Sequence, residues 1–306
     1  DIDACLAAHQ AALEHARVAG LSYLEARAHG GMGDAWYMRG RVGTAHEAFD
    51  RCIALAETRE DAWLRAGNLC MRGVTRFYGN DLEGAWKDSE DCIIQARRIG
   101  HRRAEIVARL AGFVLYDMAQ FDEAREVLTV GLEMARAIGA SRFEGWSLMF
   151  LAKIAHQEGK ADEATEHAEA AMVIARGPGA GFMGAMACGA AALCASSDIA
   201  VRAMLDEGTA LLADGSVSHN HFHFHRDAMD TALARGLWDL ALEHADALEA
   251  YTSQEPAAWS DFFIQRTRLI ARVGKGEQTS GDTAQLEALH KTARDAGLVL
   301  AAGQLP

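Results

Sequence analysis

The chain has 306 residues and a formal net charge of −13, with 30 lysines and arginines against 43 aspartates and glutamates. Binding of nucleic acid needs a surface that neutralises phosphates, so this acidic balance argues against a nucleic-acid partner. No stretch is apolar over the roughly 20 residues that a membrane span needs, which argues against a membrane partner as well.

Three prolines and an abundance of alanine, leucine, glutamate and arginine indicate an all-α chain. The six cysteines contain no CxxC pair, and no secretory signal begins the sequence, so we expect a reducing, cytoplasmic setting. Residues 2–20 already resemble the second helix of a repeated unit. We therefore expect the chain to be a piece of a longer protein.

Hydrophobic periodicity and turn residues predict fifteen helices in chain order. They span residues 3–18, 22–39, 43–57, 60–78, 82–98, 101–118, 121–138, 141–158, 161–176, 182–195, 198–213, 219–235, 238–253, 258–273 and 283–296.

A repeated unit of about 40 residues underlies these helices. Six alanines mark the same step of the unit, at Ala45, Ala85, Ala124, Ala164, Ala203 and Ala241. Self-similarity at such a spacing is the signature of a solenoid, in which each unit buries its apolar face against its neighbours. We expect one continuous domain over 1–306, most regular over 21–180, with 1–20 left from a truncated first unit and 181–306 forming divergent repeats and a C-terminal cap.

Glycines mark the predicted helix ends. A turn is expected at residues 40–43, and an Ala-Arg pair precedes Gly20, Gly100, Gly139 and Gly179, which places a cation in the last turn and a glycine just beyond it. The stretch 177–181 is interpreted as a loop between units, because no lysine, serine or threonine follows in the place that a phosphate-binding loop requires.

These small-residue spacings resemble the tetratricopeptide repeat (TPR), with residues 121–124 and 160–164 similar to that family's turn into its second helix. The family repeat has 34 residues, so a 40-residue unit implies helices that are longer by about a turn each. The resemblance implies a right-handed α-solenoid of about seven helix pairs.

In the TPR family the first helix of each pair lines the binding groove. Carrying those positions onto this sequence implies a partner-binding groove of Arg27, Asp34, Tyr37, Met38, Tyr78, Arg109, Tyr116, Asp117, Lys153, His156, His223, Arg226 and Asp230. Aromatic residues and arginine are common interface anchors. Three further aromatics, Phe77, Phe113 and Trp146, fit the groove and the packing between units equally well.

Four histidines alternate with other residues at positions 219, 221, 223 and 225. As a strand they would share one face and suit a transition metal, but the repeat register predicts a helix, which separates them into two pairs. We expect no metal site, with His219 and His223 as the alternative ligands.

The sequence contains no GxxxxGK[ST], GxSxG or strand-linked GxGxxG motif, so neither an enzyme nor a cofactor is expected. Acidic pairs such as Glu90-Asp91 fit solvent-facing turns.

Longer stretches resemble the C-terminal repeat region of bacterial signalling proteins that carry a class III adenylate/guanylate cyclase and an AAA-type ATPase domain. The stretches are 33–35, 45–46, 49–52, 71–73, 80–82, 100–105, 142–144, 219–220, 224–228, 255–256 and 259–263. The resemblance implies a non-catalytic scaffold that binds a protein or peptide, including other domains of its parent chain. The alternative is a domain that senses a small molecule or metal through residues 219–225.

Overall fold

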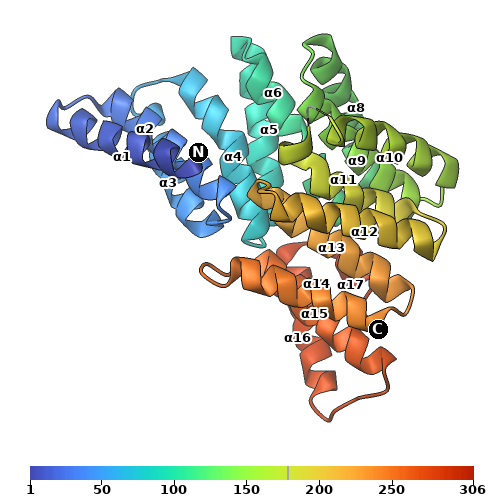
Figure 1. The fold of residues 1–306 in the computed structure, drawn as a ribbon. Helices are drawn as coiled ribbons and strands as arrows, with labels where there is room; N and C mark the ends of the chain where they lie inside the picture. Colours follow the sequence, from blue (N-terminus) through green and yellow to red (C-terminus); the bar gives the residue numbers. More distant parts are fainter. Residues whose placement is uncertain (178) are drawn as a thin grey trace. The chain divides into compact units, whose positions relative to one another are not determined.

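A computed structural model describes residues 1–177 and 179–306, and within them the chain forms seventeen α-helices (Figure 1). Of the expected inter-unit loop at 177–181, Pro178 lies outside the described residues. The protein is an all-α solenoid. No helix in the described part of the chain has the length and apolar character needed to cross a membrane.

The chain divides into two compact units, residues 1–111 and 112–306, where the sequence indicated one continuous domain. A single domain therefore stays a prediction, and each unit is described by itself. Unit 1 consists of α1 (Ile2–Val18), α2 (Ser22–Met38), α3 (Val42–Glu57), α4 (Ala62–Tyr78), α5 (Leu82–Ile99) and α6 (Arg102–Arg109). Each helix packs against the next, and the first helices α2, α4 and α6 also touch one another in turn.

Unit 2 continues the same helix-pair pattern. It consists of α7 (Gly112–Asp117), α8 (Phe121–Ala137), α9 (Ser141–Gln157), α10 (Ala161–Ala175), α11 (Ala180–Cys194), α12 (Asp198–Ala213), α13 (Ser218–Ala234), α14 (Trp238–Thr252), α15 (Ala258–Gly274), α16 (Asp282–Ala296) and α17 (Val299–Ala302). The short α17, which the sequence did not predict, packs against α7.

Residues in the left-handed backbone conformation follow the helix ends at regular steps along the chain. Positive φ angles recur about every 20 residues at Gly20, Gly40, Glu60, Asn80, Gly100, Ala119, Gly139 and Gly159. Glycine adopts this conformation without steric cost, which explains its prevalence in the series. The expectation for Gly179 was wrong: its φ is −94°, and it directly precedes α11.

Five of the six repeated alanines are buried as expected, and Ala203 is the exception. On α12 the buried side chains are instead Val201, Leu205 and Leu212. The register of the repeat has therefore shifted by the time it reaches this helix, and Ala203 faces outward.

The predicted helix over 101–118 is divided in the structure. After α6 the amide of Leu110 is shared between the carbonyls of Ile106 and Val107, and the amide of Ala111 bonds to Ala108, three residues back, so the chain passes into the tighter 3₁₀ pattern. The helix resumes at Gly112, where a β-carbon would lie 2.5 Å from Leu128 of α8. The glycine thus permits the close packing of α7 on α8.

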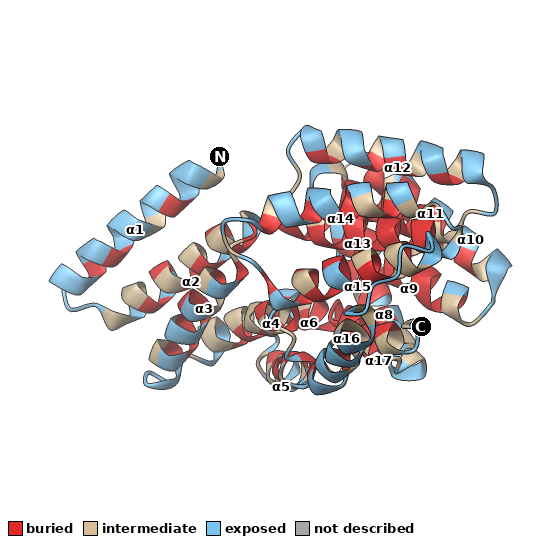
Figure 2. Cartoon of the chain, turned by 90° about the horizontal axis from the view of Figure 1, so that it is seen from below, coloured by how far each residue is buried: buried red, intermediate tan, exposed pale blue. Residues whose placement is uncertain are grey.

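Burial is concentrated in the first helices of unit 2. Figure 2 shows α9, α11 and α13 largely in the buried colour, whereas α1 and α12 are mostly exposed. On α9 every residue from 145 to 155 is buried, polar ones included. This position brings charged side chains of α9 and α13 into the interior of unit 2.

Candidate partner-binding surfaces

In unit 1 the exposed face of α2 carries three of the predicted groove residues. Arg27, Asp34 and Met38 are exposed and lie one or two helical turns apart, so they share one face. The carboxylate of Asp34 reaches solvent, and the surrounding chain nevertheless displaces enough water to raise its pKa to about 6, against the opposing charges of Arg103 and His9. We call this row, with the neighbouring first helices α4 and α6, the first-helix face of unit 1.

Three other predicted groove residues of unit 1 are buried, which differs from the accessible position that the resemblance implied. Tyr37 and Tyr78 pack together with ring centroids 6.5 Å apart. Arg109 is paired with Glu105 of its own helix at 2.9 Å. These side chains hold neighbouring helices together, and Phe77, which fitted both roles, is also fully buried.

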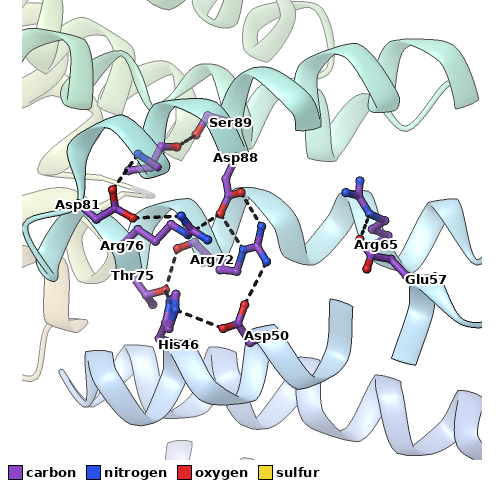
Figure 3. A network of polar contacts seen from close by, with 12 residues as sticks. His46, Asp50, Glu57, Arg65, Arg72, Thr75, Arg76, Asp81, Asp88 and Ser89 are labelled. Carbon is purple, nitrogen blue, oxygen red and sulfur yellow. Dashed lines mark hydrogen bonds and ion pairs between the residues drawn. The ribbon is translucent and has the colours of Figure 1, made fainter. Parts of the chain in front are cut away.

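A polar network that the sequence analysis missed ties α3, α4 and α5 together (Figure 3). Arg72 of α4 donates two hydrogen bonds to Asp88 of α5, at 2.7 and 2.6 Å, and a third to Asp50 of α3 at 3.0 Å. Arg76 also contacts Asp88, at 3.1 Å. The one sequence signal for this network is Asp88, an aspartate at a core position of the second helix of its pair, where it is buried.

In unit 2 the predicted groove residues form a buried ion network. Lys153 of α9 contacts Asp227 of α13 at 2.6 Å. Arg226 of α13 contacts Asp117 of α7 at 2.9 Å and Asp230 at 3.1 Å. Arg266 of α15 completes the network by contacting Asp230 at 2.6 Å. With three cations and three carboxylates the network is balanced in charge.

Aromatic rings enclose this network. The guanidinium of Arg226 lies 4.8 Å from the ring centroid of Phe263 and 5.5 Å from that of Tyr116, both favourable cation–π distances. The ammonium of Lys153 lies 4.9 Å from the centroid of Phe150. The indole nitrogen of Trp259 donates to Asp117 at 3.3 Å. The enclosure accounts for the exclusion of water from charged groups that are usually exposed.

Burial and the neighbouring charges together set the direction of the pKa shifts in this network. Desolvation lowers the pKa of Lys153 and raises that of Asp227, although each partner's charge opposes the change. Burial also acts to raise the pKa of Asp230, yet Arg266 and Arg226 together hold it below its usual value. The network thus holds Asp230 more firmly in its charged form than Asp227.

The histidine segment lies on α13, so the predicted helix is confirmed. The side chain of His219 contacts the carbonyl oxygen of Phe182, and His223 lies among aromatic rings, with the Trp259 centroid 5.5 Å away. His221 stacks on Tyr251, with centroids 3.8 Å apart. The described residues contain no group of three potential metal ligands, and the space beside His223 has no room for a water molecule. The geometry therefore lends no support to a sensor at His219 and His223.

The remaining predicted residues of unit 2 divide between surface and interior. His156, near the end of α9, is exposed. Phe113 and Trp146, which fitted both groove and packing, are buried against each other with centroids 5.8 Å apart. The inner side of unit 2 is thus filled by its own side chains.

Comparison with known proteins reports on the fold. No protein-family model and no curated protein matches the chain. Solved structures of Rap proteins, which are TPR-like helical repeat proteins, do match the chain. The fold is therefore of the TPR type.

Three of these structures indicate the extent of the likeness. The Rap conjugation gene regulator of plasmid pLS20 in complex with the Phr* peptide aligns with TM-score 0.65 and 12% identity, over 93% of this chain and 78% of that one. A Rap protein complexed with Competence and Sporulation Factor gives 0.51 and 14%, over 92% and 66%. The apo form of RapI gives 0.52 and 12%, over 94% and 77%. The chain thus spans about two thirds to four fifths of the proteins it matches, and the low identities show the fold alone.

Proposed function

We propose that this chain is a non-catalytic, regulatory protein-interaction domain that binds a partner segment along the first-helix face of unit 1. The observation that carries the proposal is the exposed row of Arg27, Asp34 and Met38 on α2. A cation, a carboxylate and a thioether on one accessible face offer both charge recognition and an adaptable apolar contact. Two of the similar Rap structures, one with Phr* and one with Competence and Sporulation Factor, support a ligand-binding role for such a fold.

The partner is a protein or peptide, and a domain of the parent chain is the favoured source. This part of the proposal rests on the resemblance to bacterial cyclase and AAA-type ATPase signalling proteins. In such a cytoplasmic parent, the repeats would regulate catalysis that is carried out elsewhere. The net charge of −13 favours a partner segment with a cationic character.

Unit 2 contributes differently in this proposal. Its charged groove residues form ion pairs inside the unit: Lys153 with Asp227, and Arg226 with Asp117 and Asp230. They therefore stabilise the repeat array and do not contact the partner. His156 stays available at the surface. The proposed binding surface is consequently smaller than the groove that the TPR resemblance implies.

Site-specific photo-crosslinking tests the proposal. Benzoylphenylalanine in place of Met38 should crosslink the partner segment, and the product should be lost when Arg27→Glu and Asp34→Arg reverse the neighbouring charges. The matched control places the crosslinker at Ile94 of α5, which is 61% exposed on a second helix. A partner captured equally at both positions, or crosslinking at Met38 that survives the charge reversal, would contradict the proposal.

A further inference from the structure

An apolar groove lies in unit 2 between the second helices α10 and α12. Its walls include Ala168, Met172 and Val173 of α10 and Ala203 and Met204 of α12, with Ala191 of α11 at its floor. The space that it offers to a ligand measures about 690 Å³, whereas the space beside the buried His223 has no room for a water molecule.

The groove exists because the repeat register has shifted on α12. Val201, Leu205 and Leu212 point into the core, which turns Ala203 and Ile199 outward. Val173, which lines the groove, is 75% exposed, and Ile199 near the start of α12 is 85% exposed. Single exposed aliphatic residues are ordinary, but one that lines an apolar groove marks an interaction surface.

One end of the groove is closed by an ion pair. Arg176, at the end of α10, donates two hydrogen bonds to Glu207 of α12, at 2.8 and 2.7 Å. The pair links the two walls. The residues of α10 that line the groove run from Thr165 to Arg176, which makes this wall about 17 Å long at 1.5 Å per residue.

The two helices that form the groove carry acidic residues. Glu169 lines the groove, Asp162 and Glu166 on α10 and Asp206 on α12 are exposed on the same helices, and none of the four makes an ion pair with any residue that the structure describes. The cation Arg176 is already occupied by Glu207. Charge complementarity therefore selects an occupant that carries lysine or arginine beside its apolar surface.

We propose that the α10–α12 groove docks an amphipathic helix of a partner protein, with an apolar stripe flanked by lysine or arginine residues. A helix of about three turns matches the length of the α10 wall, and the alanines of the floor and wall let its backbone approach closely. This is the helix-in-groove mode of recognition, with the acidic residues of α10 and α12 supplying the preference for a cationic helix. The site is formed by α10, α11 and α12 and does not involve the first-helix face of unit 1.

Fluorescence anisotropy with a labelled 16-residue amphipathic Leu/Lys peptide tests the groove on the full chain. We expect Val173→Lys and Ala203→Lys each to weaken binding at least tenfold, since both put a bulky cation into the groove. Both positions are exposed, so the variants should fold, which circular dichroism checks. Ile138→Lys is the matched control, because Ile138 is 48% exposed at the end of α8 and lies outside the groove.

A matched Leu/Glu peptide with the same apolar stripe separates charge from hydrophobic contact. It should bind at least tenfold more weakly, and Glu166→Gln with Glu169→Gln should reduce the difference between the two peptides. Equal binding of both peptides, or binding that Val173→Lys leaves unchanged, would overturn the proposal. A dimer in light scattering that Val173→Lys dissociates would also overturn it, because a second copy of the chain would then occupy the groove.

Discussion

At the scale of single residues, the pair Lys153–Asp227 offers a direct test of the buried network. Replacing Lys153 by methionine leaves the Asp227 carboxylate buried without its ammonium partner, so Lys153→Met should lower the free energy of unfolding by about 3 to 5 kcal/mol. Neutralising the carboxylate as well removes the uncompensated charge, so Lys153→Met with Asp227→Asn should be more stable than the single variant. Urea unfolding measures both.

The surface pair Lys291–Asp295 is the control for this cycle. It joins two exposed side chains one helical turn apart on α16, and removing it should cost about 0.5 kcal/mol or less. A cost for Lys153→Met no larger than this, or a double variant less stable than the single one, would mean that the buried pair is not the source of the stability.

The burial of this pair could not be predicted from the sequence. Lysine, arginine and aspartate are rarely buried unless they are paired, so their place on first helices indicated an exposed groove. Their partners lie far away along the chain, as when Trp259 donates to Asp117 across 142 residues. Sequence spacing predicted the helices that carry these residues, but only the packing of α7, α9, α13 and α15 shows that the charged side chains meet inside unit 2.

At the scale of an element, the end of α7 carries an unfavourable residue. Ala119 has φ 57°, where Gly40 and Gly159 occupy the equivalent turns. A β-carbon in this left-handed conformation costs about 1 kcal/mol or more, which exceeds the extra backbone entropy that glycine loses on folding. Ala119→Gly should therefore raise the free energy of unfolding by about 0.5 to 1 kcal/mol in urea titrations.

The control substitution Ala137→Gly should change the free energy of unfolding in the opposite direction. Ala137 is exposed in the last turn of α8, where glycine gains nothing from a left-handed backbone and should destabilise by about 0.5 to 1 kcal/mol. If both substitutions destabilise the protein to the same degree, the backbone at Ala119 is not the cause of the expected gain.

Most helices were predictable because turn glycines and apolar periodicity both mark their ends. The failures have local causes. The turn at Leu110 and Ala111 contains neither proline nor glycine, and the single Gly112 that follows does not by itself end a helical pattern, so the sequence indicates one helix there. Ala203 kept the repeat spacing while the packing of α12 shifted, and small residues such as alanine fit either face of a helix.

At the scale of the whole molecule, the distribution of buried histidines predicts sensitivity to acid. Burial lowers the pKa of His219, His221 and His244 to about 4 and that of His225 to about 3. All four belong to α13 and α14 of unit 2. Below the unfolded-state pKa of 6.5 the unfolded chain binds protons that these folded side chains do not, so stability falls as the pH falls from 6.5 towards 4.

Fewer groups have a pKa shift that stabilises the folded chain as the pH falls. Desolvation raises the pKa of Asp34 to about 6 and also raises that of Asp227, which adds some stability over the same range. A shift of about 2.5 to 3.5 units corresponds to about 3 to 5 kcal/mol for a fully buried histidine, so the histidines decide the sign of the pH dependence. We therefore expect the chain to be least stable at the acidic end of this range, and we expect unit 2 to be the part that unfolds first.

Urea unfolding at pH 7.5 and pH 5.0 measures this effect, and the midpoint should be clearly lower at pH 5.0. His221→Phe keeps the stack on Tyr251 while removing one titrating ring, so the difference between the two midpoints should shrink. His15→Gln, an exposed position on α1 of unit 1, should leave that difference as it is in the unsubstituted chain. A midpoint that rises on acidification, or a pH dependence that responds to His15 and not to His221, would place the acid sensitivity outside the buried histidines of α13 and α14.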